Sequence, residues 1–365
     1  TSPSQPIDLG NSGTSARLLM GLLATHDLSA VMVGDASLSR RPMGRVTEPL
    51  SKMGGQFEAR EGGRLPIHVR GTDTPLPLEY TVPVASAQVK SAILLAGLNT
   101  PGRTVVRESV ATRDYTESML AHMGADITVQ PWGEGGTGRE ISVTGYAELA
   151  PVDVEVPGDI SSAAFLLVAA SIVPGSDVVI ENVGINPLRT GLIDVLLAMG
   201  ADIKVADERT IGGERVADLH VRAAKLKGIT SMPVHPSTLI DEFPVLFVAA
   251  ACAEGESYFS GLEELRVKES DRLSAMAAVL SGAGVVLEEG AESLRIQGGY
   301  TPSGKVVVGG NTATTHLDHR IAMSASILGM VSESGVHVDD ASPINTSFPG
   351  YSALMTSLGA VFEGA

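Results

Sequence analysis

The segment HMGADI at residues 122–127 returns almost unchanged as AMGADI at residues 198–203. Each segment closes a stretch with the apolar spacing of an amphipathic helix, and glycine just past a helix end is the usual left-handed terminator. Similar endings occur as KMGGQF at 52–57, GAGVVL at 282–287 and SLGAVF at 357–362. This recurrence predicts that the chain is built from repeated units.

Each unit also contains an earlier helix that is rich in small residues. These helices are expected to begin near Asn11, Ala85, Asp159, Leu239 and Thr315, so the pattern recurs about every 75 residues. Segments of β type, such as SDVVIENV at 176–183, lie between and after the helices. The period is too long for the common solenoids, so it favours α+β units arranged about a pseudo-symmetry axis.

The repeat breaks at VEVPGD, residues 154–159. We therefore expect one domain at 1–157 with two repeat units and a second at 158–365 with three. A symmetric set of three plus three would need one more unit before Thr1. The sequence thus predicts that an N-terminal piece, on this chain or on another, completes the first domain.

Composition excludes several classes of function. The net charge of −16 and the aromatic content of 4% argue against a nucleic-acid surface. The apolar runs are too short to span a bilayer, no targeting segment is visible, and the single Cys252 lies in an apolar stretch typical of a buried, inert thiol. A reducing, cytoplasmic location is expected.

Metal and acyl-transfer chemistry have little support. His316 and His319 flank Asp318, but no second cluster with zinc-type spacing accompanies them. No GxSxG elbow occurs either. We expect no metal and no cofactor.

Cations are concentrated where helices are expected to begin. In RVKESDR, residues 266–272, Lys268 and Arg272 are four residues apart, and like charges at this spacing weaken a helix, as do cations at its N-terminus. Arg41 before Pro42, Arg113 and Arg320 repeat the pattern. Because helix N-termini attract anions, the repetition predicts a site for phosphate- and carboxylate-bearing ligands, with structural ion pairing as the alternative.

Two acids accompany these cations. Glu269 adjoins Lys268, and Asp241 stands at the edge of an apolar helix, where a nearby cation can tune it for proton transfer. Capping of that helix by Asp241 is an equally good interpretation. The loop LGNSGTSAR at 9–17 is a weak candidate phosphate cradle, because it lacks the lysine of a P-loop.

Eight segments, in order, resemble the 5-enolpyruvylshikimate-3-phosphate synthases. They are GNSGTSAR, GDASLSRRPMGR, VASAQVKSAILLAGL, GDISSAAF, LIDEFP, LRVKESDRLSAM, HLDHRIAMS and TSFPGY. RPMGR, ASAQVKSA and TSFP are closest to the class II group. The resemblance implies an α/β fold, a two-domain inside-out barrel of βαβαββ units, five of six of which lie in this chain. It also implies enolpyruvyl transfer from phosphoenolpyruvate to the 5-hydroxyl of shikimate 3-phosphate, through a tetrahedral intermediate, between domains that close on the substrates.

The resemblance also implies roles for individual residues. The residues expected to bind phosphoenolpyruvate are Asn11, Gly13, Arg41, Gln88, Arg272 and Arg320. Those expected to bind shikimate 3-phosphate are Ser86, Ala87, Gln88, Arg113, Asp241 and Lys268. Asp241, Lys268 and Glu269 are the expected catalytic residues, with Glu269 as proton donor and acceptor at the methylene carbon. How proton transfer divides among these three stays open.

The chain departs from the family pattern in two places. The family's N-terminal Lys-Ser-x-x-x-Arg segment is absent, so activity is expected only when the missing piece is supplied, for example by a separate polypeptide. Thr346 stands where one class has lysine, which removes a cation near the carboxylate of phosphoenolpyruvate, whereas Gly13 leaves room for the inhibitor glyphosate. Sensitivity to glyphosate stays open.

Two other functions remain possible. The related UDP-N-acetylglucosamine enolpyruvyl transferases use a reactive cysteine in a mobile loop, which the apolar surroundings of Cys252 do not match. A fragment that binds shikimate 3-phosphate without turnover is the second alternative.

Overall fold

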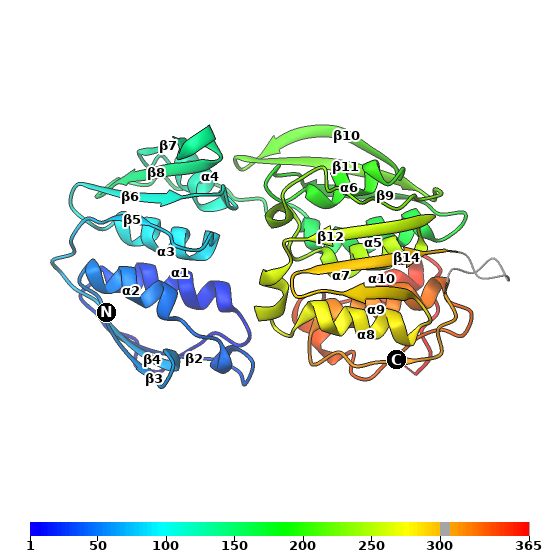
Figure 1. Ribbon diagram of the computed structural model, residues 1–365. Coiled ribbons are helices and arrows are strands. Elements are labelled where there is room, and N and C mark those ends of the chain that lie inside the picture. Colours follow the sequence, from blue (N-terminus) through cyan, green and yellow to red (C-terminus); the bar gives the residue numbers. More distant parts are fainter. Residues whose placement is uncertain (300–306, 365) are drawn as a thin grey trace. The chain divides into compact units, whose positions relative to one another are not determined.

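The computed structural model describes residues 1–299 and 307–364. The chain separates into two compact units, Thr1–Glu155 and Val156–Ala365 (Figure 1). The expected boundary lay between Pro157 and Gly158, slightly further along the chain. The expected end of the second domain, Ala365, lies outside the described residues.

The first unit contains the same succession of elements twice. Its first copy comprises β1 (Ile7–Asp8), α1 (Gly13–Ala24), β2 (Ser29–Val33), α2 (Gly44–Lys52), β3 (Gln56–Arg60) and β4 (Arg64–Arg70). Its second copy comprises β5 (Glu79–Thr81), α3 (Ala87–Gly97), β6 (Arg103–Glu108), α4 (Tyr115–His122), β7 (Ile127–Trp132) and β8 (Gly138–Thr144). The strand orders match, β1-β2-β4-β3 and β5-β6-β8-β7, with the first pair parallel and the others antiparallel. These are βαβαββ repeats.

The second unit continues the pattern with modified first strands. Its elements are α5 (Ile160–Ile172), β9 (Asp177–Gly184), α6 (Gly191–Ala198), β10 (Asp202–Ile211), β11 (Glu214–Arg222), α7 (Phe243–Cys252), β12 (Gly255–Ser260), α8 (Arg272–Gly282), β13 (Val286–Glu289), β14 (Ser293–Gly298), β15 (Thr312–Ala313), α9 (His319–Val331), β16 (His337–Val338) and α10 (Tyr351–Ser357). Single parallel bridges, Gly158 to Val183 and Lys227 to Glu254, stand where the first two repeats of this unit would have a first strand.

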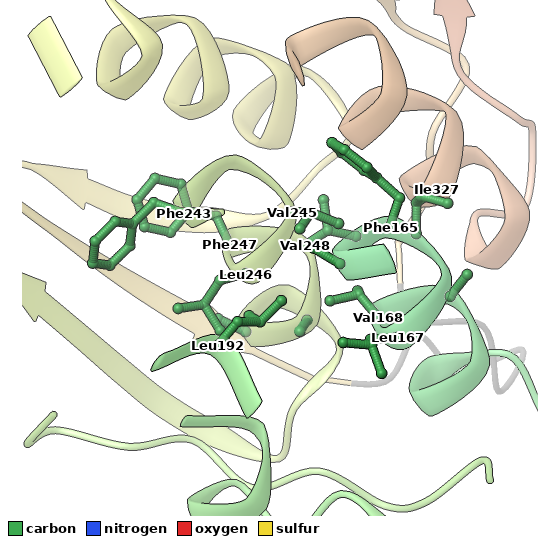
Figure 2. Packing of buried hydrophobic residues seen from close by; sticks show 14 of the residues in the cluster. Phe165, Leu167, Val168, Leu192, Phe243, Val245, Leu246, Phe247, Val248 and Ile327 are labelled. Carbon is green, nitrogen blue, oxygen red and sulfur yellow. The ribbon is translucent and has the colours of Figure 1, made fainter. Parts of the chain in front are cut away.

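Helices form the interior of each unit. All residues of α7 are buried, which suits a sequence that is apolar on every face, and α3 is buried from Val89 to Gly97 although it includes Lys90 and Ser91. In the blue and cyan unit of Figure 1, α1, α2 and α3 lie between the two sheets. Figure 2 shows Phe243 and Phe247 of α7 in the core of the other unit, with Leu167 of α5 and Ile327 of α9 in the same cluster. Helices inside and sheets outside are the arrangement expected of an inside-out barrel.

The glycine stops adopt the predicted conformation. The second helix of each repeat is followed by a glycine with positive φ: 109° at Gly54, 91° at Gly124 and Gly200, 90° at Gly284 and 100° at Gly359. A side chain is strained in this region of backbone space, so glycine is required there. The helix ends inferred from HMGADI and its relatives are therefore confirmed.

Several predicted helix starts are too early: α7 begins at Phe243 and α9 at His319, each four residues after the expected Leu239 and Thr315, and two further starts are wrong. Pro42 lies outside any helix, because Leu38–Arg40 form a short 3₁₀ helix (η1) and α2 begins only at Gly44. Lys268 is also outside a helix: the 3₁₀ helix η4 (Glu263–Val267) ends before it, and α8 begins at Arg272. Lys268 and Arg272 therefore do not repel each other along one helix, and the Asp271 carboxylate caps α8 by accepting from Ser274 N.

Among the described residues, no helix has both the length and the apolar character needed to cross a lipid bilayer.

Candidate functional site

Arg272 is the centre of a cluster of charged residues in the second unit. Its side chain is 1% exposed, and its guanidinium contacts three carboxylates: Asp318 Oδ2 at 2.9 Å from Nε, Asp241 Oδ1 at 3.2 Å from Nη1, and Glu269 Oε2 at 2.6 Å from Nη2. Burial by itself lowers the pKa of Arg272, but attraction by the three carboxylates outweighs burial and raises it above the ordinary value. The buried cation is thus stabilised by acids that surround it.

Asp318 fixes this arginine to the start of α9. Its buried carboxylate accepts from Arg272 Nε, from Ser270 Oγ at 3.0 Å and from the backbone N–H of Arg320 at 2.9 Å, which caps the helix. Burial raises the pKa of Asp318, but attraction by Arg272 outweighs it and holds the pKa below the usual value. Asp318 was considered only for metal binding, and the helix was expected to begin near Thr315, before this aspartate.

Asp241 and Lys268 meet within the same cluster. Lys268 Nζ lies 3.2 Å from Asp241 Oδ1, the oxygen that Arg272 also contacts, and Arg320 Nη1 donates to the Asp241 carbonyl oxygen at 2.9 Å. The N-cap position of α7 is taken by Glu242, without a side-chain capping bond. Capping of α7 by the Asp241 side chain is therefore wrong, and the carboxylate faces the cations.

Glu242 adds a buried acid that sequence reasoning missed. Its side chain is 1% exposed and lies 3.5 Å from Arg320 Nη1 and 3.6 Å from Arg189 Nη2. Ser161, at the start of α5, donates to Glu242 and accepts from Arg189. The start of α9 is thereby linked to the start of α5, a link between distant segments that no local sequence pattern reveals.

Two strained residues precede α9. His316 and Leu317 have φ of 52° and 61°, a left-handed conformation that is unfavourable for side chains and is often kept at functional sites. They lead into Asp318 and His319. Burial, together with the neighbouring Arg320, lowers the pKa of His319 from 6.5 to about 4. The imidazole is therefore neutral at neutral pH.

Glu269 is the more accessible partner of Arg272. Its side chain is 25% exposed, against 1% for Arg272. It borders a cavity of about 540 Å³ next to α8, which Ser270, Ser274 and His316 also line. A small molecule could reach the Glu269 carboxylate without displacing the buried arginine.

In the first unit, Arg41 is held by amide and hydroxyl groups. Its Nη2 donates to Asn11 Oδ1 at 3.0 Å and to Ser37 Oγ at 3.3 Å. Asn11 in turn donates to Asp35 Oδ2 at 2.7 Å. Burial raises the pKa of Asp35, but hydrogen bonds from the Leu38 backbone and Asn11 outweigh it and lower the pKa. Asp35 thus stays ionised and orients Asn11.

Gly13, the first residue of α1, lies close to two guanidinium groups. A Cβ at this position would be 2.9 Å from Arg17 Nη1 and 3.1 Å from Arg41 Nη1. Arg17 also donates to Gln88 Oε1 at 2.8 Å, and Gln88 donates to Thr14 Oγ1 at 2.7 Å. Asn11, Gly13, Arg41 and Gln88 therefore share one region of the first unit. Arg17 was missed, although it ends the segment GNSGTSAR.

Ser86 and Ala87 stand at the start of α3, next to Gln88. The Ser86 hydroxyl caps this helix by accepting from Val89 N at 3.4 Å, and Ala87 can offer only its backbone groups. Arg113 is half-buried in the segment between β6 and α4, directly before Asp114, the N-cap of α4.

The remaining candidates lie outside these clusters. Cys252 is buried in α7, and burial raises the pKa of its thiol to about 12, so it is not a nucleophile at neutral pH. Thr346 is exposed, and its hydroxyl donates to Pro343 O at 2.7 Å. Within the part of the chain that the structure describes, no group of three or more His, Cys, Asp or Glu side chains could hold a metal ion.

Comparisons with known proteins cover almost the whole chain. The family described as EPSP synthase (3-phosphoshikimate 1-carboxyvinyltransferase) matches residues 1–355. A 3-phosphoshikimate 1-carboxyvinyltransferase of Granulibacter bethesdensis is 56% identical over all of this chain and 79% of the relative. That of Zymomonas mobilis is 55% identical over 99% of this chain and 79% of the relative. Among solved structures, the EPSP synthase of Acinetobacter baumannii has a TM-score of 0.86 and 44% identity, covering 98% of this chain and 80% of the other.

Proposed function

The chain belongs to the EPSP synthase family, and we propose that it transfers the enolpyruvyl group of phosphoenolpyruvate to the 5-hydroxyl of shikimate 3-phosphate, releasing phosphate. The observation that carries the proposal is the cluster of charged residues around the buried Arg272. Asp241 and Glu269 contact its guanidinium group, and Lys268 contacts Asp241. Two carboxylates and two cations in contact provide groups for proton transfer and for binding of anions.

The residues proposed to bind phosphoenolpyruvate are Arg272 and Arg320 in the second unit, and Asn11, Gly13, Arg41 and Gln88 in the first. Arg272 donates to carboxylates in this structure. The substrate's carboxylate would therefore replace Asp241 or Glu269 on the guanidinium. Such an exchange keeps the buried cation paired, which avoids the large cost of an uncompensated buried charge.

Shikimate 3-phosphate would be bound in the first unit by Ser86, Ala87, Gln88 and Arg113. Serine hydroxyl, amide and backbone N–H groups at the start of α3 suit a phosphate or a polyol. Asp241 and Lys268 are the residues proposed to act on the reacting 5-hydroxyl. Arg113, directly before the N-cap of α4, would thereby acquire an anionic ligand.

The reaction would proceed by addition and elimination. The 5-hydroxyl oxygen bonds to C2 of phosphoenolpyruvate and loses its proton, while C3 gains a proton and becomes a methyl group. The C2–O bond to phosphate then breaks, and a proton leaves the methyl group to restore the double bond. Glu269, protonated when it acts, would give and retake the proton at C3, and the Asp241 carboxylate would receive the hydroxyl proton beside the Lys268 ammonium group. A general acid or base of this kind contributes roughly 10²- to 10⁴-fold.

The experiment that tests the proposal is a phosphate-release assay, in the presence of the sixth repeat described below, with phosphoenolpyruvate and either shikimate 3-phosphate or UDP-N-acetylglucosamine as acceptor. Phosphate release is expected with shikimate 3-phosphate as acceptor and not with UDP-N-acetylglucosamine. Release with UDP-N-acetylglucosamine would favour the related transferases instead, although the raised pKa of Cys252 argues against their reactive cysteine. Binding of shikimate 3-phosphate without any release would favour a binding-only protein.

Turnover would also depend on a sixth repeat. The first unit contains two βαβαββ repeats within residues 1–155, whereas the second has three first helices, α5, α7 and α9. We include in the proposal that a third repeat of the first unit, carried on the same polypeptide or on a separate one of roughly 80 residues, supplies substrate contacts. Residues 1–365 should then release phosphate only when such a segment is present. Full activity of residues 1–365 alone would contradict this.

A further inference from the structure

A buried ion triad, formed by Lys90, Glu108 and Glu117, lies in the first unit apart from the residues already assigned. Lys90 projects from the first turn of α3, and its side chain is 1% exposed. Its Nζ lies 2.7 Å from Glu117 Oε1 on α4 and 3.2 Å from Glu108 Oε1 at the end of β6. The Glu108 side chain is as deeply buried as the lysine, and that of Glu117 is 4% exposed.

The triad holds Thr112 through three hydrogen bonds. Lys90 Nζ donates to the Thr112 carbonyl oxygen at 3.2 Å. The Thr112 N–H donates to Glu108 Oε1 at 2.9 Å, and its hydroxyl donates to Glu108 Oε2 at 2.6 Å. All three hydrogen-bonding groups of one loop residue are thereby bonded to the triad, and the next residue is Arg113.

A second link ties α4 to α3 at the same level. The buried Thr116 hydroxyl donates to Ser91 Oγ at 2.7 Å, one residue after Lys90. The segment that carries Arg113 is therefore held on both sides, by Thr112 before it and Thr116 after it, against the helix whose first residues are Ala87 and Gln88.

Burying the triad costs desolvation free energy, so its charges are a poor means of stabilising a core. Buried ion pairs often stabilise no more than apolar side chains of similar volume, because both charges lose their hydration. Here two carboxylates share one ammonium group, and Glu117 Oε2 has no hydrogen-bond partner among the described residues. Burial raises the pKa of Glu117 despite the attraction of Lys90. Beyond packing, the triad holds the groups that hydrogen-bond to Thr112 in fixed positions.

We propose that Lys90, Glu108 and Glu117 are positioning residues that fix Thr112, and through it Arg113, relative to the start of α3, and thereby set the affinity for shikimate 3-phosphate. This inference rests on the proposed function, in which Arg113 and the start of α3 both bind that substrate. The triad itself does not touch the substrate.

Thr112→Val tests the inference with little change in shape, because it removes only the hydroxyl that donates to Glu108. We expect the KM for shikimate 3-phosphate to rise about fivefold, the effect of one such hydrogen bond, with kcat and the KM for phosphoenolpyruvate changed less than about twofold. Thr112→Ser keeps the hydroxyl and should restore the wild-type KM. Thr144→Val is the matched control, since the Thr144 hydroxyl donates to the Asp126 carboxylate at 2.7 Å, away from the triad.

Lys90→Met should have the larger effect, raising the KM for shikimate 3-phosphate more than Thr112→Val does. If this variant fails to fold, Thr112→Val and Thr112→Ser decide the question. Equal changes in both KM values, no change in either, or the same change in Thr144→Val would overturn the inference.

Hydrogen exchange separates this inference from the proposed function. Backbone amides of residues 112–116 should exchange faster in Thr112→Val than in wild type, in the full chain without substrate. If the wild type does not use shikimate 3-phosphate, the proposed function fails. Unchanged exchange in Thr112→Val would overturn the positioning role whatever the substrate.

Discussion

In the second unit, Arg272 is bonded to three carboxylates, whereas in the first unit Arg41 and Arg17 donate to amide, hydroxyl and carbonyl oxygens. Releasing an amide or hydroxyl oxygen from an arginine leaves no buried charge unpaired, although Arg41 also attracts the Asp35 carboxylate. An arginine surrounded by acids must exchange one carboxylate for another, but it keeps those acids close to the ligand. The difference indicates that the first unit is suited to binding and the second to proton transfer.

The largest expected effect comes from removing a proton-transfer group in the second unit. Glu269→Gln preserves the shape of the residue and a hydrogen bond to Arg272, but the amide cannot exchange a proton. We expect kcat to fall roughly 10³-fold with the affinity for shikimate 3-phosphate unchanged. Glu289→Gln is the control, because Glu289 forms a similar ion pair with Arg266 at 3.0 Å. A loss below tenfold in Glu269→Gln would make the second unit a binding region like the first.

Acid should affect the second unit through His319. The pKa of this residue is about 4 in the folded protein against 6.5 in the unfolded chain, so the unfolded chain binds more protons between these values. Stability is therefore retained above pH 6.5 and lost as the pH falls towards 4, by about 2 kcal/mol at pH 5.

His319→Asn should flatten this dependence, as measured by urea unfolding between pH 7 and pH 5. His122→Asn, a change of an exposed histidine on α4 of the first unit, should leave the dependence unchanged. Equal slopes in wild type and His319→Asn would show that the buried surroundings of His319 do not control the loss.

In the first unit, Gly13→Ala should weaken anion binding without reducing stability. The new Cβ would displace the flexible ends of Arg17 and Arg41, at 2.9 and 3.1 Å. We expect the KM for phosphoenolpyruvate to rise about tenfold, as for the loss of one charge-assisted hydrogen bond, with kcat nearly unchanged. Gly44→Ala is the control, because nothing lies within 4 Å of a Cβ there. A fall in kcat instead would assign chemistry, not only binding, to the first unit.

The smallest effect is expected for Thr346→Lys, which adds an exposed cation to the second unit. A new exposed ion pair contributes a few tenths of a kcal/mol, so the KM for phosphoenolpyruvate should fall about twofold. Thr356→Lys places the same charge on the exposed face of α10 as a control. If both variants behave alike, the effect belongs to the overall charge of the protein and not to a site.

The sequence predicted what depends on neighbouring residues. The glycine after each second helix and the spacing of the helices are local signals, and both are confirmed. The start of α8 was placed too early, because Lys268 and Arg272 were taken to lie on one helix. The capping residue Asp271 marks the actual start. Pro42 was likewise a plausible first helical residue, but η1 and the chain after it delay α2 to Gly44.

Contacts between distant residues could not be read from the sequence. Arg272 contacts Asp318, although all of the chain from α8 to β14 lies between them in sequence. Likewise, Glu108 and Glu117 contact Lys90 from two other elements. A carboxylate next to a predicted helix gives no information about which cation it meets. The candidate residues could therefore be named in advance, but their partners, which decide whether a cation is open to a ligand, come only from the fold.

The glycine after each second helix has a consequence for how substitutions would be tolerated. At Gly124 and Gly359 no atom lies within 4 Å of a Cβ, so space does not forbid a side chain there, and only the handedness of the backbone does. In a saturation screen these positions should reject alanine as firmly as tryptophan, and asparagine should be the best tolerated replacement. At Gly54 and Gly284 side-chain size should matter as well, because a Cβ there would lie 2.8 Å from Thr72 Cγ2 and 3.3 Å from Val308 Cγ2, so rejection of alanine, and not its independence of size, would recur with the repeat in genetic data.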